Sequence, residues 1–172
     1  MSMDKMIPLM LGGIKDTLYM TTVSTLFAYL LGLPLAILLV LTAPSGLKPQ
    51  KLVYRLLDTV VNIFRSIPFL ILMIICLPLS KFLVGTKVGT LATIPPMVIA
   101  AFPLVARMVE SSLREVDQGV VEASQSMGAT PFQIITKVMI PECLPGLISS
   151  MTTALTTILG YSAMSGVIGG GG

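Results

Sequence analysis

The sequence contains no histidine and no tryptophan, and its two cysteines, Cys76 and Cys143, lie far apart in the chain. Without histidine and without a close cysteine pair, the usual ligands of a zinc site are missing. No glycine-rich loop is followed by Lys and Ser or Thr, so the sequence offers no phosphate-binding loop. No nucleophile stands beside a base either. We therefore expect neither a catalytic site nor a bound cofactor in this chain.

Charge is also scarce. Only 11% of the 172 residues are charged, against roughly 25% in average soluble proteins, whereas 54% are hydrophobic. The net charge of +3 comes with no basic run and no interleaved aromatic patch, which argues against nucleic-acid binding. This composition predicts an all-α protein, a polytopic transmembrane helical bundle that forms one domain over residues 1–172.

Four apolar segments are long enough to cross a bilayer, which takes about 20 residues. The predicted spans lie near residues 17–43, 57–80, 91–108 and 144–168. The first exceeds the apolar region of a signal peptide, about 7–15 residues, so we expect it to stay as a membrane helix. In the second, we place Arg65 close to the membrane surface, where its long stem can snorkel.

The distribution of Lys and Arg predicts the orientation, because cytoplasmic loops carry an excess of these residues. If the N-terminus is outside, seven fall on the inner side, namely Lys48, Lys51, Arg55, Arg65, Arg107, Arg114 and Lys137. Four fall on the outer side, namely Lys5, Lys15, Lys81 and Lys87. We therefore predict an outer N-terminus and a cytoplasmic location for the polar segment 110–142.

Segment 110–142 has a fixed internal layout. Gly128 can end one short helix, because glycine takes a positive φ at little cost. Thr130 then fits an N-cap, Pro131 the first helical position and Gln133 the last position of a capping box. The pattern predicts two short helices joined at a glycine.

This amphipathic segment could lie on lipid or bind a protein. Helices on a lipid surface usually carry a polar face rich in Lys and Arg. Residues 115–133 contain Glu115, Asp117 and Glu122 but no Lys or Arg. The composition favours a protein partner with a hydrophobic groove, where Glu122 could pair with a basic residue.

The same segment carries a family resemblance. Glu122, Ala123, Gly128 and Pro141 match the EAA signature of bacterial ATP-binding-cassette importer permeases, with Ser124 in place of the third alanine. Five further stretches resemble the permeases of the methionine-uptake type, namely NIFRSIPF (62–69), ARMVE (106–110), GATPFQI (128–134), PECLPGL (141–147) and GYSAMSG (160–166). The resemblance assigns coupling to an ATPase to Glu122, Ala123, Ser124, Gly128, Ala129, Thr130, Pro131 and Pro141.

The resemblance implies the type I importer permease fold, a homodimer with five spans per subunit in the bacterial inner membrane. Four spans are present here, and the fifth, which the resemblance places after a glycine-rich stretch such as 169–172, is missing from this sequence. It also implies an outer N-terminus, two cytoplasmic ATPase subunits that bind ATP and magnesium, and an extracytoplasmic substrate-binding protein. Membrane lipid is the remaining partner.

Methionine, in its L and D forms, is the cargo that the resemblance implies. The residues alone leave open another polar amino acid or a small peptide. They also leave open a passive channel or a scaffold subunit, although neither needs an ordered polar segment such as 110–142.

The last predicted span is the best candidate for lining a path, because Tyr161, Ser162 and Met164 lie among small residues there. Met164 is flexible and apolar, so two copies could close a symmetric axis. Core packing is the more frequent role of a methionine. Since spans three and four hold no deep charge, a zwitterion such as an amino acid could pass without a strong internal site. Selectivity would then lie in the external binding protein that the resemblance implies.

Overall fold

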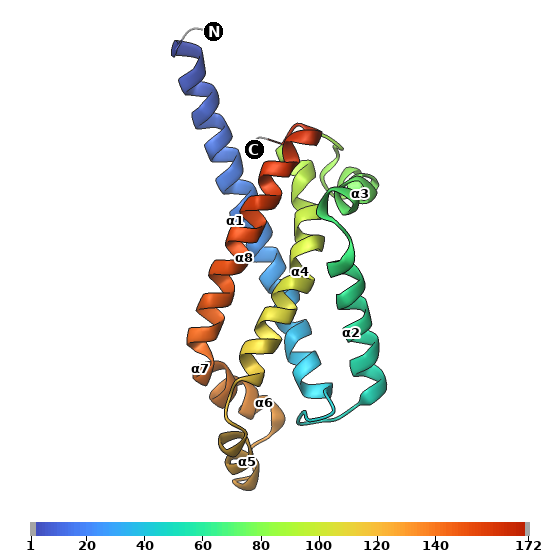
Figure 1. Ribbon diagram of the computed structural model, residues 1–172, viewed down its shortest axis with the longest axis vertical. Helices are drawn as coiled ribbons and strands as arrows, with labels where there is room; N and C mark the ends of the chain where they lie inside the picture. Colours follow the sequence, from blue (N-terminus) through green and yellow to red (C-terminus); the bar gives the residue numbers. More distant parts are fainter. Residues whose placement is uncertain (1–2, 171–172) are drawn as a thin grey trace.

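The computed structural model describes residues 3–170, with side chains from residue 6 onward, and all regular structure in this part of the chain is helical (Figure 1). The elements are α1 Met3–Thr42, α2 Lys51–Ser66, α3 Phe69–Val84, α4 Thr90–Arg114, α5 Gln118–Ser126, α6 Pro131–Ile134, a π-helix Ile135–Met139, α7 Ile140–Glu142, α8 Leu144–Met164 and a 3-10 turn Ser165–Ile168. The Lys5 side chain and the last two glycines, used in the sequence analysis, lie outside the described residues.

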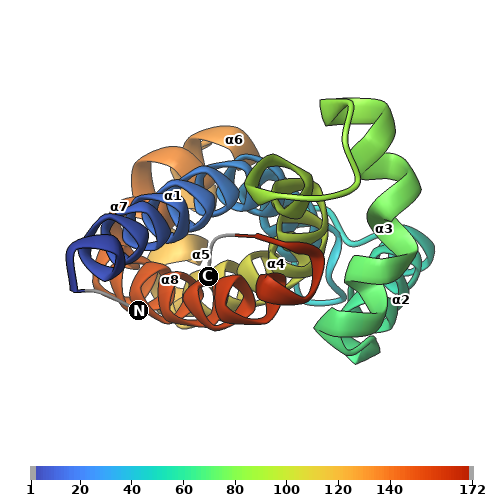
Figure 2. The ribbon, with the colours of Figure 1, turned by 90° about the horizontal axis from the view of Figure 1, so that it is seen from above.

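The long helices α1, α4 and α8 lie side by side and form the body of the bundle (Figures 1 and 2). Small residues allow α1 to approach α4 closely, because Ala28, Ala36 and Ala101 are fully buried in the shared core. At Gly32 an added Cβ would lie 2.8 Å from the Val105 side chain and 2.9 Å from a backbone oxygen of α4. The contact between α1 and α4 therefore depends on a glycine.

Three helices are long and apolar enough to span a bilayer, and a fourth span results if α2 and α3 count as one broken span. The three run over Met6–Thr42, Thr90–Arg114 and Leu144–Ile168. The first helix begins before residue 17, the predicted start of its span. The helix Thr90–Arg114 continues past residue 108, the predicted end of its span, whereas the last helix agrees with the predicted 144–168. The helix Thr90–Arg114 continues past residue 108 because its polar residues Arg107, Glu110 and Arg114 bind one another along its surface.

The predicted single helix over 57–80 is wrong. α2 ends at Ser66 and α3 begins at Phe69, and the two are bent by 105° at this break. Ile67 is extended, with φ −84° and ψ 122°, because the Cδ of the following Pro68 disfavours the helical conformation of the residue before it.

The break leaves Arg65 at the end of α2 and not inside a continuous helix over 57–80. α2 begins at Lys51, at the α5 end of the bundle, and rises toward α3 (Figure 1). At 1.5 Å per residue, Arg65 lies about 21 Å along the helix from Lys51. Arg65 therefore lies at the α3 end of α2, and Lys51 lies at the α5 end.

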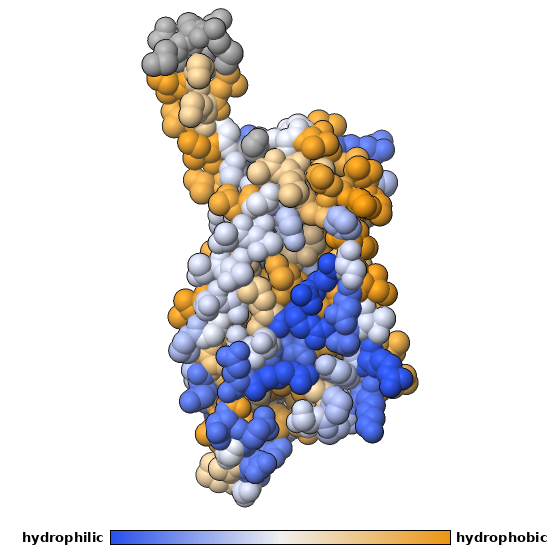
Figure 3. Space-filling model, viewed as in Figure 1, coloured by the Kyte–Doolittle hydropathy of each residue, from blue (hydrophilic) through white to orange (hydrophobic). Residues whose placement is uncertain are grey.

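Hydrophilic atoms gather around α5 and extend upward along α2 and α4 on the face shown in Figure 3. Paler atoms follow α8 on the same face, and hydrophobic atoms cover much of the opposite end of the molecule. The bundle therefore has one polar end and one partly polar side.

Candidate functional site

The segment between α4 and α8 folds into two helices joined by a glycine, as predicted. Asp117 caps α5, because its side chain accepts hydrogen bonds from the backbone N–H groups of Gly119 (2.7 Å) and Val120 (3.3 Å). Gly128 has φ 81°, and its N–H donates to the Gln125 carbonyl at 2.9 Å. The left-handed turn there redirects the chain into α6.

The predicted capping box opens α6. The Gln133 N–H donates to the Thr130 hydroxyl (3.3 Å), and the Thr130 N–H donates to the Gln133 side chain (2.9 Å). Pro131 occupies the first turn, where its missing N–H costs nothing. These bonds fix the start of the helix independently of any partner.

The apolar side chains that follow the start of α6 are buried, and most of them lie in a helix wider than an α-helix. Ile134, Ile135 and Met139 are almost fully buried, while residues 135–139 form a π-helix. Pro141 lacks the N–H that would bond to the carbonyl four residues earlier, and its ring crowds that carbonyl, which favours a wider turn. The loop is thus anchored in the core directly before α8.

The outer surface of α5, α6 and the turn between them, which we call the loop surface, carries large exposed apolar side chains among polar ones and one carboxylate. Met127 is 81% and Phe132 is 75% exposed, and Val120 and Glu122 are also exposed. Such large apolar side chains on an ordered loop indicate a partner-binding surface. Of the predicted coupling residues, the structure exposes Glu122, Ala123, Gly128, Thr130 and Pro141, half-buries Ala129 and Pro131, and buries Ser124.

Ser124 faces inward and is almost fully buried. Its hydroxyl donates to the Val120 carbonyl at 2.8 Å, so the buried polar group is satisfied. This explains how serine can stand where the EAA signature has alanine.

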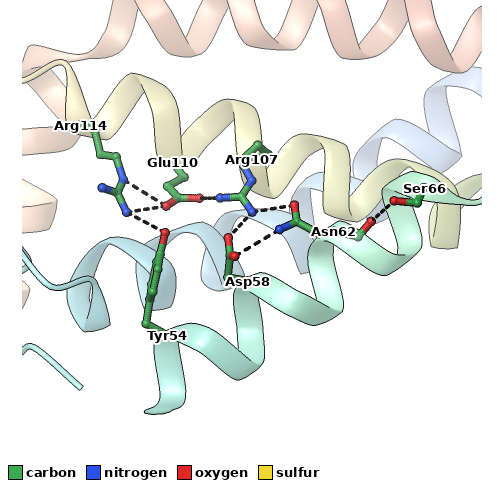
Figure 4. A network of polar contacts seen from close by, with 7 residues as sticks. All are labelled: Tyr54, Asp58, Asn62, Ser66, Arg107, Glu110 and Arg114. Carbon is green, nitrogen blue, oxygen red and sulfur yellow. Dashed lines mark hydrogen bonds and ion pairs between the residues drawn. The ribbon is translucent and has the colours of Figure 1, made fainter. Parts of the chain in front are cut away.

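A charged network, missed in the sequence analysis, joins α2 to α4 (Figure 4). Glu110 is 2% exposed and accepts hydrogen bonds from Arg107 (2.8 Å) and Arg114 (2.7 Å). Arg107 also donates to Asp58 (2.5 Å) and Asn62 (3.1 Å) of α2. The signal was the spacing of Arg107, Glu110 and Arg114 at three and four residues, which places them on one side of a helix.

The three candidate gate residues do not converge on one point. Tyr161 stacks on Phe69 of α3, with ring centroids 4.4 Å apart and an interplanar angle of 11°. Ser162 is buried and donates to the Leu159 carbonyl at 2.7 Å. Met164 is 45% exposed. Within this subunit, only Met164 lies where a second copy could reach it freely.

Most of α8 is exposed, and much of the exposed part carries hydroxyl groups. Thr152, Thr153 and Thr156 each donate to the carbonyl four residues earlier, at 3.1, 3.1 and 2.9 Å. Their hydroxyls are therefore satisfied within the helix, yet a polar helix surface is not what lipid favours. This surface is suited to a second subunit or to a water-filled path.

The chain is similar to known permeases over nearly its whole length. A family profile described as "Binding-protein-dependent transport system inner membrane component" matches residues 28–172. The D-methionine transport system permease protein MetI of Yersinia pestis is 49% identical over 163 residues, which cover 95% of this chain and 75% of that protein. MetI of Escherichia coli K12 is 46% identical over the same shares of both chains.

Solved structures agree with the sequence comparison. An inward-facing structure of the MetNI methionine ABC transporter superposes with a TM-score of 0.96 at 46% identity, covering 100% of this chain and 79% of the other. A crystal structure of an amino acid ABC transporter with histidines superposes at 0.76 with 22% identity, a likeness of fold alone, covering 96% and 74% of the two chains. The predicted type I importer permease fold is confirmed, and the chain belongs to the family of inner membrane components of binding-protein-dependent transport systems.

Proposed function

We propose that this chain is the permease subunit of an ABC importer that carries methionine, in its L and D forms, into the bacterial cytoplasm. The single observation that supports this cargo most is the similarity to D-methionine permeases over 95% of the chain. The chain itself serves as a transport subunit and not as an enzyme, and it uses no cofactor of its own. Two cytoplasmic ATPase subunits bind ATP and magnesium.

The loop surface is the part that meets the ATPase. Its exposed Met127 and Phe132 suit a hydrophobic groove, and the exposed Glu122 suits a basic residue at the rim of that groove. The buried Ile135 and Met139 would carry the displacement of the loop into α8 through Pro141. For ATP to drive the cycle, the ATPase must bind one permease conformation more tightly than the other.

A second copy of the chain would pack near the exposed hydroxyl-bearing surface of α8. This arrangement removes that surface from lipid and brings Met164 of each subunit toward a common axis. Met164 and Tyr161 then serve as candidate gate residues, whereas the buried Ser162 supports the helix from within. An extracytoplasmic binding protein would deliver the cargo at the α3 end of the bundle.

The same proposal fixes the orientation, with the N-terminus outside and the α5 end in the cytoplasm. Lys48, Lys51 and Arg55 lie at or near that end, beside the loop. Arg65 lies at the α3 end of α2, so we no longer count it on the inner side. The inner side then holds six Lys and Arg residues and the outer side holds four. The charge bias still favours this orientation.

Uptake of labelled L-methionine tests the proposal in cells that lack their own importer and express this permease with its ATPase and binding protein. We expect uptake that excess D-methionine competes away and that Glu122→Lys abolishes, while Glu115→Lys, an exposed reversal outside α5, retains it. If the ATPase copurifies but no methionine enters, the importer stands and another amino acid or a small peptide is the cargo. If no ATPase copurifies, a passive channel or scaffold subunit is the better explanation.

A further inference from the structure

A cavity of about 170 Å³ lies where the broken span meets α4 and α8. Its walls include Phe64 and Arg65 of α2, Phe69 of α3, Leu104 of α4 and Tyr161 of α8. Pockets for drug-sized ligands usually measure about 300–1,000 Å³, so this one suits a smaller molecule. The cavity exists because the chain turns at Ile67 and Pro68, and one wall is the stacked pair of Phe69 and Tyr161.

Arg65 is the one charged side chain among the described residues that line this cavity. It is exposed, and in the described part of the chain it forms neither an ion pair nor a side-chain hydrogen bond, whereas Arg107 and Arg114 of the network are both paired. Arg65 lies about 21 Å along α2 from Lys51, so with Lys51 at the membrane surface it would fall within a hydrocarbon core of about 30 Å. A charged side chain at such a depth is costly and is typically retained for a function.

The cavity lies between α2, α4 and α8, the helices that carry the polar side of the bundle. The hydrophilic atoms in Figure 3 extend upward along α2 and α4, toward the helices that contribute the cavity walls. Tyr161, on the opposite wall, belongs to α8 with its exposed hydroxyl groups. A path for a polar cargo would follow this side.

We propose that this cavity holds the amino acid in transit, with the Arg65 guanidinium binding the α-carboxylate and the aromatic wall packing against an apolar side chain. The planar guanidinium matches a carboxylate through two parallel hydrogen bonds. A thioether packs well against aromatic rings, as Phe64, Phe69 and Tyr161 would allow. The inference rests on the proposed amino-acid cargo, and it replaces the expectation that the permease lacks an internal site.

Equilibrium binding of labelled L-methionine tests the site, using the permease–ATPase complex in nanodiscs of zwitterionic lipid without the binding protein. We expect saturable binding that unlabelled L-methionine displaces and that methionine amide, which lacks the carboxylate, does not. Arg65→Gln should weaken binding by about tenfold or more, the scale of a hydrogen bond to a charged group, and Arg65→Lys should restore part of it. Arg55→Gln is the matched control, because Arg55 is exposed on the same helix but does not line the cavity.

The outcomes separate the site from the cargo. If the wild type and Arg65→Gln bind methionine equally, the proposed Arg65 site is wrong. The proposed function as a methionine importer is unaffected by that result. Binding of a different amino acid with the same dependence on Arg65 supports the site and discards methionine. A lipid phosphate has the same chemistry as a carboxylate, so loss of methionine binding in nanodiscs with phosphatidylglycerol would assign Arg65 to lipid and overturn the proposal. Absence of saturable binding of any amino acid to the wild type also overturns it.

Discussion

Arg107 of α4 and Asp58 of α2 form an ion pair at 2.5 Å although 49 positions separate them in the sequence. Glu110 holds the other side of the Arg107 guanidinium and also binds Arg114, so one buried carboxylate serves two arginines. The network fixes α2, the first half of the broken span, against the central helix of the bundle (Figure 4). Its loss would weaken the attachment of α2 to α4.

Removal of the shared acceptor should destabilise the subunit. Glu110→Ala leaves Arg107 and Arg114 without their common carboxylate. Both guanidinium groups are partly exposed and Arg107 keeps Asp58, so the cost should lie below the roughly 3–5 kcal/mol of breaking a fully buried pair. We expect a clearly lower midpoint of thermal unfolding for the purified permease–ATPase complex. Glu115→Ala, which removes an exposed carboxylate one turn further on, should leave the midpoint nearly unchanged. Equal midpoints for both variants would contradict the structural role of the network.

The glycine turn between α5 and α6 should tolerate asparagine but not proline. Proline cannot adopt φ 81°, and it would also remove the N–H that donates to Gln125. Asparagine takes the left-handed conformation with little strain. In reconstituted transporter we expect Gly128→Pro to hydrolyse ATP without transport and Gly128→Asn to keep both activities. Transport in step with hydrolysis by Gly128→Pro would rule out this turn as the coupling joint.

The close approach of α1 to α4 should depend on Gly32. A Cβ there meets the side chain of Val105 and the backbone oxygen of Phe102 at under 3 Å, and the backbone cannot move aside without shifting a helix. Gly32→Ala should cost about 1–3 kcal/mol, the usual range for overpacking, and lower the thermal midpoint. Gly13→Ala, at a helical glycine with no neighbouring atom within 4 Å, serves as the control and should not. A midpoint unchanged by Gly32→Ala would show that the helices are further apart.

Cys143 should react slowly with maleimides. Burial raises the pKa of its thiol, so less of the reactive thiolate is present at any given pH than for an exposed cysteine, and labelling should need a more alkaline medium. Gln125→Cys in a Cys143→Ala background places an exposed thiol on α5 for comparison. That thiol should react readily and only from the cytoplasmic side. Labelling of position 125 only from outside would reverse the proposed orientation.

Met164 should meet its counterpart in the second subunit. In a background without native cysteines, Met164→Cys should form a disulfide-linked dimer in at least one nucleotide state of the transporter. Phe82→Cys is the control, because Phe82 is exposed on α3, away from α8, and should remain monomeric. No cross-link at position 164 in any nucleotide state would remove Met164 from the gate.

Local signals explain which parts of this protein were predictable. The turn at Gly128 and the capping box of Thr130 and Gln133 depend on residues within a few positions of one another. The sequence therefore predicts both features correctly. The sequence analysis predicted one continuous span across Ile67, because apolar residues lie on both sides of it. Pro68 was the signal for the break, since a proline disfavours the helical conformation of the residue before it. The pairing of Asp58 with Arg107 lay beyond sequence reasoning, since it depends on how α2 lies against α4.

The exposed Met127 and Phe132 have a consequence for how the transporter is made. If the loop surface binds the proposed ATPase, a subunit inserted without that partner would expose two large apolar side chains, which chaperones and proteases recognise. Orphan subunits should therefore be short-lived. The cell then has reason to synthesise permease and ATPase in matched amounts.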